Sequence, residues 1–142
     1  MEMTPRLRSA LNYAQDSLAA FGHSHVSSAH LVLGLLTLHG GVADSLLRKS
    51  GLSVESVETY LSRRRSSAGE GVHQDGIPLG SSAVSAFQRA EAEARQRQHT
   101  YLGIEHLLLG ILAADGGEAS DLFASVHIDS ERMKRILVQE IQ

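Results

Sequence analysis

The chain has 142 residues, which suits one compact domain, and its bulk composition excludes several classes of protein. Hydrophobic residues make up 42% and charged residues 20%, a balance typical of globular rather than disordered chains. The absence of cysteine excludes disulfides, thiolate metal sites and cysteine nucleophiles, and a net charge of −3 gives no reason to expect nucleic acid as a partner. No segment resembles a signal peptide or approaches the ~20 apolar residues of a membrane span, so we expect a cytoplasmic protein.

Helical spacing of apolar residues predicts four helices in the first 62 residues. The first is expected to follow Thr4, with Pro5 in its first turn. The second contains the run 31–36, which is apolar on every side and therefore typical of a buried helix. A third, short helix and a fourth follow. The residues expected to cap or end these helices are Thr4, Gly22, Ser27 or Ser28, Gly51 and Ser53.

The chain matches itself when it is shifted by 76 residues. The match runs without a gap from about 9–61 against 85–137. It aligns His23 with His99, His30 with His106, Leu33 with Leu109, Gly34 with Gly110, Gly40-Gly41 with Gly116-Gly117, and Leu46 with Leu122. Such a dense match indicates the duplication of one supersecondary unit.

We therefore predict an all-α fold of eight helices, arranged as two pseudo-symmetric tandem four-helix repeats in a single domain over 1–142. Repeat one is expected to span 1–62 and repeat two 79–142. The segment 63–78 is largely polar and rich in Gly and Ser, so we expect it to be a flexible, exposed linker.

A glycine occupies the same place inside the apolar helix of each repeat, at Gly34 and Gly110. Glycine inside a helix costs about 1 kcal/mol relative to alanine. Its presence at both positions predicts a close helix crossing in which no side chain fits. The neighbouring Leu33 and Leu109 are expected to be buried at equivalent places.

Residues 103–112, Gly-Ile-Glu-His-Leu-Leu-Leu-Gly-Ile-Leu, resemble the G-T-E-H-L-L-L-G-L-L motif of the N-terminal domains of Clp ATPases. Residues 22–31 form a weaker copy, and the resemblance covers nearly the whole chain. It implies an eight-helix accessory domain that receives substrates and adaptor proteins for AAA+ ATPase modules, either excised from a longer protein or acting in trans as a stand-alone relative.

The resemblance therefore implies a binding module of a Clp-type AAA+ unfoldase or protease system, with no cofactor and no catalysis of its own. The implied partners are a Clp-type ATPase, adaptor proteins or protein substrates. The 142 residues contain no G-x-x-x-x-G-K-[ST] loop to hold nucleotide phosphates, so we expect no ATP hydrolysis by that route.

Some members of this family recognise phosphorylated arginine. The glutamate of each motif faces the guanidinium, and a threonine at the start of each unit helps to hold the phosphate. In this sequence the first unit keeps Thr4 but has Ala29 in place of the glutamate, whereas the second keeps Glu105 but has Gly80 opposite Thr4. The resemblance thus makes Thr4 and Glu105 the candidate residues for binding a ligand or partner, and guanidinium binding is expected at the second unit only.

A helix-turn-helix DNA-binding element is one alternative, because residues 43–65 combine two short helical patterns, a glycine turn and three arginines. A recognition helix of this kind needs basic residues. Here the expected second helix carries Glu55 and Glu58 instead, and the same pattern recurs in the second unit.

A histidine-dependent metal site is the other alternative, because His23, His25 and His30 lie close together in the sequence. Their spacing fits no standard zinc motif, and no nearby acidic or cysteine residue completes the ligand set. His30 and its repeat partner His106 are expected to be packed and hydrogen-bonded at the starts of their helices. Glu105 has a structural alternative as well, since an acidic residue in the first turn of a helix is stabilising there.

Overall fold

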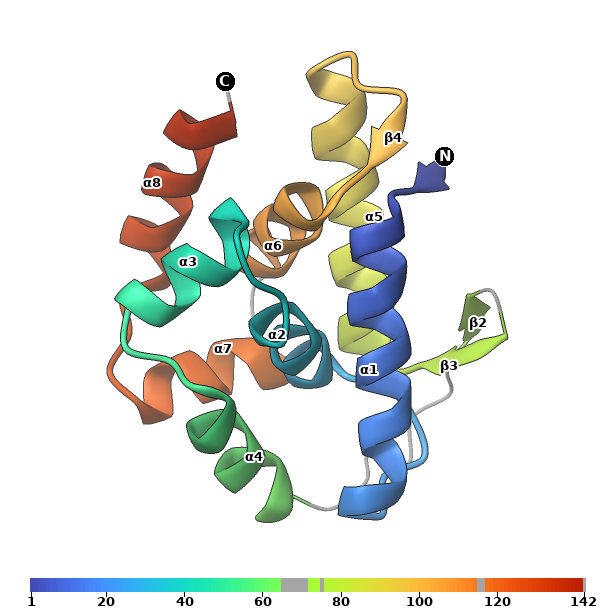
Figure 1. Cartoon of the computed structure of the whole chain (residues 1–142), viewed down its shortest axis with the longest axis vertical. Coiled ribbons are helices and arrows are strands. Elements are labelled where there is room, and N and C mark those ends of the chain that lie inside the picture. The colour runs from blue at the N-terminus through green and yellow to red at the C-terminus, as the bar shows by residue number, and fades with distance from the viewer. Residues whose placement is uncertain (65–71, 75, 115–116, 142) are drawn as a thin grey trace.

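The computed structural model describes residues 1–64, 72–74, 76–114 and 117–141 (Figure 1). Within these residues the chain forms eight helices and four very short strands. The helices are α1 (Pro5–Phe21), α2 (Ser28–Leu36), α3 (Val42–Lys49), α4 (Val54–Ser62), α5 (Ser81–Gln96), α6 (Ile104–Ala113), α7 (Gly117–Ser125) and α8 (Ser130–Ile141). The strands are β1 (Glu2–Met3), β2 (Val72–Gln74), β3 (Ile77–Leu79) and β4 (Tyr101–Leu102).

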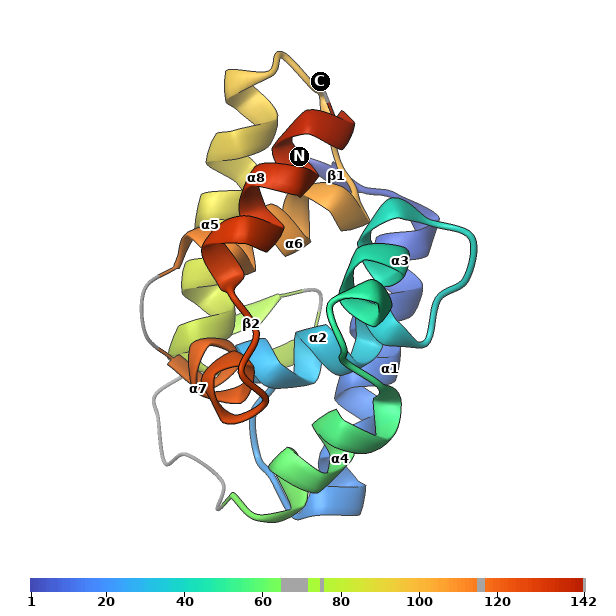
Figure 2. The same cartoon turned by 90° about the vertical axis from the view of Figure 1, so that its left-hand side faces the viewer.

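The helices confirm the predicted duplication. A shift of 76 residues carries α1 to 81–97, α2 to 104–112, α3 to 118–125 and α4 to 130–138, which are the places of α5 to α8. Figure 2 shows the helices of repeat one, α1, α3 and α4, on one side of the molecule and α5, α7 and α8 of repeat two on the other. The predicted all-α fold of eight helices is therefore confirmed.

The expected capping residues end the helices as predicted. The side chains of Thr4, Ser27 and Ser53 each accept a hydrogen bond from a backbone N–H of the first turn that follows. Gly22 ends α1 with a φ of 69°, a left-handed conformation that glycine adopts without strain. These boundaries follow from local chemistry, which explains why they could be read from the sequence.

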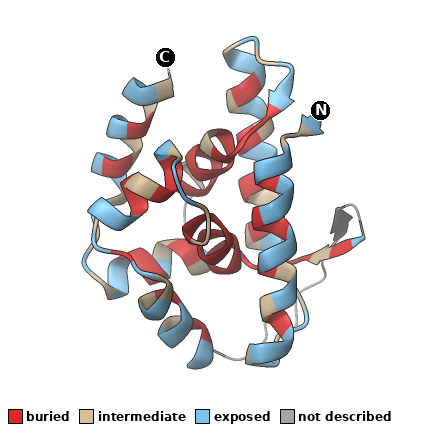
Figure 3. Ribbon diagram, viewed as in Figure 1, coloured by how far each residue is buried: buried red, intermediate tan, exposed pale blue. Residues whose placement is uncertain are grey.

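The two apolar helices, α2 and α6, lie at the centre of the molecule and are almost entirely buried (Figure 3). Every residue of α2 is buried, and Leu33 and Leu109 are 1% and 0% exposed. The burial of these two leucines at equivalent places is confirmed. None of the helices in the described part of the chain has the length and apolar character needed to cross a membrane.

Gly34 and Gly110 mark two equivalent helix crossings, as predicted. A Cβ atom at Gly34 would lie 2.2 Å from the carbonyl oxygen of Ala10 in α1. A Cβ at Gly110 would lie 2.2 Å from the carbonyl oxygen of Ala86 in α5. Because these neighbours are backbone atoms, the helices approach this closely only where a side chain is missing.

The strands join the two repeats, although no pattern in the sequence predicts these pairings. β1 pairs in parallel with β4, so that Met3 lies opposite Leu102 and the N–H of Thr4 donates to the Leu102 carbonyl. An isolated parallel bridge joins Leu79 to Val26. The 76-residue shift relates the two contacts, so the start of each repeat pairs with the segment that precedes the buried helix of the other repeat.

The expected linker differs from its prediction at its C-terminal end. Residues 65–71 and Asp75 lie outside the described residues, but Val72–Gln74 pair antiparallel with Ile77–Leu79. Ile77 is 5% exposed, and Leu79, just after the predicted linker, is 1% exposed. Alternation along β3 turns these two apolar side chains into the core, so this end of the segment is not an exposed linker. The boundaries of 63–78 otherwise stay a prediction.

Candidate binding cleft between the repeats

Thr4 and Glu105 line the same cavity, which has a volume of about 490 Å³. The expected grouping of Thr4 with Ala29 and of Glu105 with Gly80, one pair for each repeat, is wrong. The pairing of β1 with β4 brings the residue that follows β1, Thr4, to the start of α6, where Glu105 lies. The two candidate residues, each without its expected partner in its own repeat, therefore meet across the repeats.

The Glu105 carboxylate lies in the first turn of α6, where the helix dipole favours a negative charge. It folds back over Gly103, since an added Cβ there would lie 2.6 Å from Glu105 Oε1. His106 Nδ1 is 3.8 Å from the same oxygen, but burial lowers the pKa of His106, and the ring is therefore neutral at neutral pH. Among the described residues, the Glu105 carboxylate thus has no charged partner.

A pair of histidines supports the wall that carries Glu105. The N–H of Gly103 donates to His106 Nδ1 over 2.9 Å. The proton of the neutral His106 ring is therefore on Nε2, which lies 2.7 Å from His99 Nδ1 and donates to it. His99 then carries its own proton on Nε2, and it stacks on Tyr101 with 5.3 Å between the ring centres. This relay fixes the loop between α5 and α6 beside the cavity.

The first repeat contains the same relay. The N–H of Ser27 donates to His30 Nδ1, His30 Nε2 donates to His23 Nδ1 over 2.8 Å, and His23 Nε2 donates to the Arg64 carbonyl. Burial, with a smaller contribution from His23, lowers the pKa of His30 to about 4. His25 is separate and bonds to the Ser24 hydroxyl.

These bonds leave no free lone pair on the rings of His23 and His30, so the histidine-dependent metal site gains no support from the geometry. In the part of the chain that the structure describes, no three His, Cys, Asp or Glu residues form a cluster suited to a metal ion. The prediction that His30 and His106 are packed and hydrogen-bonded is confirmed, as they are 3% and 0% exposed.

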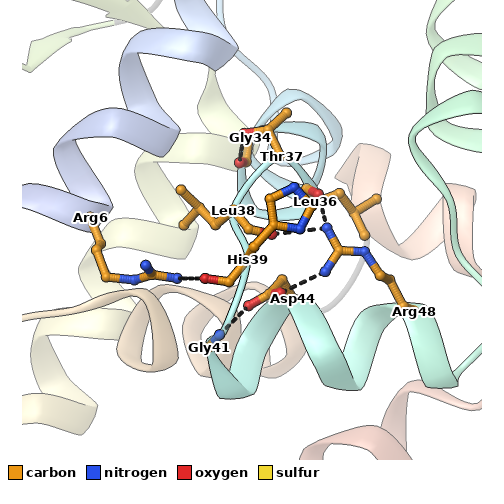
Figure 4. Close-up of polar contacts among 9 residues, drawn as sticks. All are labelled: Arg6, Gly34, Leu36, Thr37, Leu38, His39, Gly41, Asp44 and Arg48. Carbon is orange, nitrogen blue, oxygen red and sulfur yellow. Dashed lines mark hydrogen bonds and ion pairs between the residues drawn. The ribbon is translucent and has the colours of Figure 1, made fainter.

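The loop between α2 and α3 forms another wall of the cavity and is held by two arginines (Figure 4). Arg48 donates to Asp44 Oδ2 over 2.6 Å, to the Leu36 carbonyl at the end of α2 and to the Leu38 carbonyl in this loop. Asp44 Oδ1 accepts from the N–H of Gly41. Arg6 of α1 donates to the His39 carbonyl over 2.8 Å. Asp44 is only 2% exposed, and charge-assisted bonds at such a site are strong. The loop is thus rigidly positioned.

We call the contacts of Asp44 and Arg48 with the loop between α2 and α3 the clamp. Sequence reasoning missed it, although the sequence contains a signal for it. Asp44 and Arg48 stand four residues apart in a short helix that directly follows two glycines, a spacing that places both side chains on one face. The 76-residue shift carries them to Ser120 and Ala124, so the clamp belongs to the first repeat alone.

A second hollow of about 300 Å³ adjoins the cavity, between α3 and α8. Both hollows are lined by Gly40, Gly41, Val42 and Glu140, and the second adds Lys49 and Ile136 among others. We call the two together the inter-repeat cleft. It runs from Tyr101 and Glu105, past the clamped loop, to Lys49.

Comparison with known proteins relates this chain to one family. The description of the family that matches residues 2–136 is the Clp repeat (R) N-terminal domain. A probable ATP-dependent Clp protease ATP-binding subunit of Chlamydia pneumoniae is 29% identical over 142 residues, and the match covers 99% of this chain and 17% of that protein. The chaperone protein ClpB of Bacillus cereus is 26% identical over 96% of this chain and 16% of its own length.

The chain therefore spans about a sixth of the length of these curated relatives. Among solved structures, the N-terminal domain of ClpD from Arabidopsis thaliana superposes with a TM-score of 0.81 at 19% identity, over 99% of this chain and 94% of that one. The Hsp104 N-terminal domain from Candida albicans gives a TM-score of 0.75 at 15% identity, over 97% and 90%. The duplicated helices, the repeated motif and the family match over residues 2–136 together show that the chain belongs to the Clp repeat N-terminal domain family.

Proposed function

We propose that this chain is a docking module for substrates or adaptor proteins of a Clp-type AAA+ unfoldase system, and that it acts by protein recognition without catalysis of its own. Membership of the family supports this role in general. The observation that carries it for this chain is the cavity in which Thr4 and Glu105 meet across the two repeats. The proposed site is thus a single composite site.

The chemistry of the cavity favours an arginine side chain of a partner protein, with or without a phosphoryl group. Glu105 supplies the carboxylate that a guanidinium pairs with, and charge-assisted pairs are the strong ones. Thr4 and Arg6 line the same cavity, and a hydroxyl and a guanidinium are suited to an oxygen beside the bound cation. In the other repeat the corresponding positions are Ala29 and Gly80, which have no polar side-chain atom.

The DNA-binding alternative receives no support from the geometry. Glu55 and Glu58 are exposed on α4, the helix that would read the bases, and carboxylates there repel phosphate. The proposed role therefore concerns protein partners.

Calorimetric titration with phosphoarginine and with an unphosphorylated arginine peptide tests this function. We expect one site per chain, an affinity that falls with added salt, and loss of binding in Glu105→Gln. Glu118→Gln is the matched control, because Glu118 occupies the corresponding cavity of the other repeat, where it accepts from the Ser82 hydroxyl. Two equal sites, or binding that survives Glu105→Gln but not Glu118→Gln, would show that the site is placed on the wrong residues.

A further inference from the structure

The inter-repeat cleft has a counterpart on the other side of the pseudo-symmetric molecule. The 76-residue shift carries Ser45 of α3 to Asp121 of α7. It also carries Tyr60 of α4 and Arg64, two residues after α4, to Ile136 and Glu140 of α8. Tyr60, Arg64 and Asp121 line a hollow between α4 and α7, which thus corresponds to the hollow between α3 and α8. The two clefts are formed by equivalent helices but differ in the side chains at their openings.

The counterpart is bridged by its own polar side chains. The Tyr60 hydroxyl donates to the Asp121 carboxylate over 2.8 Å, and Arg64 donates to the same oxygen over 2.9 Å. The Arg64 guanidinium also lies over the Tyr60 ring, 5.3 Å from its centre. These contacts join the end of α4 to α7 across the opening.

The inter-repeat cleft has no such bridge, because Ile136 and Ser45 stand where Tyr60 and Asp121 stand in the counterpart. Instead it exposes apolar surface. Five large hydrophobic side chains are exposed within the described residues, and three of them line this cleft: Val42 at 39%, Tyr101 at 42% and Ile136 at 38%. Exposed apolar side chains gathered at one concave place, rather than scattered, mark a surface that a partner covers.

An acidic and a basic side chain stand at the two ends of the cleft, and a second acidic side chain lines both of its hollows. Glu105 lies in the hollow beside Tyr101, and Lys49 lies in the hollow beside Ile136. Glu140 lines both. Within the described part of the chain, none of these three side chains forms an ion pair with an arginine, a lysine or an acidic residue. Their charges are free to complement those of a bound molecule.

We propose that the inter-repeat cleft binds an extended peptide segment of a partner protein that carries a basic side chain, then apolar side chains, then an acidic side chain. The basic group pairs with Glu105, the apolar groups cover Val42 and Ile136, and the acidic group lies toward Lys49. This inference rests on the proposed function and specifies the segment that the docking site selects. The bridged counterpart predicts that each chain binds one such segment.

An extended peptide is the class of ligand that fits the volumes of the two hollows and the residues that line them. The two hollows, of about 490 and 300 Å³, are more than one side chain fills, and the clamped loop between them presents backbone at Gly40 and Gly41. An extended chain crosses such a glycine-lined surface and places side chains into the hollows on both sides. Apolar contacts at the centre of a polar rim are typical of the groups that dominate binding.

The test uses fluorescence anisotropy with a short labelled peptide that contains an arginine, two leucines and a glutamate. Two matched peptides replace the leucines by serine or the arginine by glutamate. We expect each chain to bind one copy of the first peptide, called the parent peptide. The affinity for each matched peptide is expected to be lower by a factor of about ten or more. Lys49→Glu is expected to lose the parent peptide and to regain binding of a peptide in which arginine replaces the glutamate.

A triple variant tests the inference most directly, because it introduces into the cleft the three side chains that bridge the counterpart. Ser45→Asp, Ile136→Tyr and Glu140→Arg together import the bridge formed by Asp121, Tyr60 and Arg64, and we expect this triple variant to lose the peptide while keeping the helical circular dichroism spectrum. Ile136→Ser is a milder second test, because this side chain is 38% exposed. Tyr60→Phe, which removes the counterpart's hydroxyl, is expected to leave binding unchanged.

Two results would overturn the inference. One is that binding of the arginine peptide is lost in Glu105→Gln but is unchanged in the triple variant, in Ile136→Ser and when serine replaces the leucines of the peptide. The proposed function would then stand, but the proposal that the cleft binds the rest of the segment would not. The other is an absence of binding for every peptide, with phosphoarginine also failing, which would remove the proposed function together with the cleft.

Discussion

Replacing Gly110 by alanine tests the helix crossing on which the buried centre of repeat two depends. In most helix interiors this change is stabilising, because alanine is favoured over glycine by about 1 kcal/mol. At Gly110 the added Cβ would lie 2.2 Å from the Ala86 carbonyl oxygen, 2.7 Å from the Ala90 nitrogen and 3.0 Å from its Cβ. Two of these three atoms belong to the backbone of α5, so relief requires the helices to separate.

Overpacking of a well-packed core costs about 1–3 kcal/mol, and a contact with backbone at this distance belongs at the upper end of that range. After the gain in helix propensity, we expect a net loss of about 2 kcal/mol in the free energy of unfolding. For a domain of this size, 1 kcal/mol corresponds to roughly 4 °C, so Tm should fall by about 8 °C. Urea denaturation and differential scanning calorimetry measure the two quantities.

The exposed helical position Ala92 provides the control. Ala92→Gly should cost about 1 kcal/mol from propensity alone, so alanine is favoured at 92 and glycine at 110. A Gly110→Ala variant that is as stable as the natural protein, or more stable, would refute the crossing. Gly34→Ala should behave like Gly110→Ala, since the Ala10 carbonyl oxygen lies 2.2 Å from the added atom.

Further predictions address the core, the relay and the absence of catalysis. Leu109→Ala should cost about 2–5 kcal/mol in urea denaturation, as expected of a fully buried leucine, and a loss below about 1 kcal/mol would contradict its central place. The pKa of His30 is lowered to about 4, so the unfolded chain takes up a proton at a higher pH than the folded one. The free energy of unfolding should therefore be highest above pH 6.5 and fall by about 2 kcal/mol at pH 5, and His30→Asn should flatten this slope. Gly103→Ala should displace the Glu105 carboxylate and weaken arginine binding with little change in Tm. Rigorously purified protein should show no ATP turnover, because the chain has no loop for nucleotide phosphates.

Much of the fold was readable from the sequence because its signals are local and occur twice. Capping residues such as Ser27 and Ser53 act within one helical turn, and the apolar runs of α2 and α6 identify the buried helices without reference to the rest of the chain. The duplicated Gly34 and Gly110 indicated close contact, although not with which helix. Each of these features can be recognised in a short window of sequence.

The composite site formed by Thr4 and Glu105 could not be predicted from the sequence, because the strand pairing that forms it joins distant parts of the chain. β1 and β4 are two residues long, which is too short for any alternation pattern to appear, and their pairing joins residues about a hundred positions apart. Without it, Thr4 and Glu105 were assigned to separate sites. The buried strand at Ile77–Leu79 was missed for a similar reason, since polar and glycine-rich residues precede it and dominate the composition of the segment.

Duplication by itself would give two equivalent clefts, and the repeated residues indeed build equivalent frameworks. His30, His106 and the crossing glycines are buried, so altering one of them leaves a cavity, a clash or an unpaired polar group in the core. The rims are different: Tyr60 and Asp121 on one side, and Val42 and Ile136 on the other, are partly or well exposed and can change at little cost in stability. Stability thus depends on what the repeats share, whereas recognition depends on where they differ. A single open cleft is the expected result when a symmetric scaffold keeps its core and diverges only at its surface.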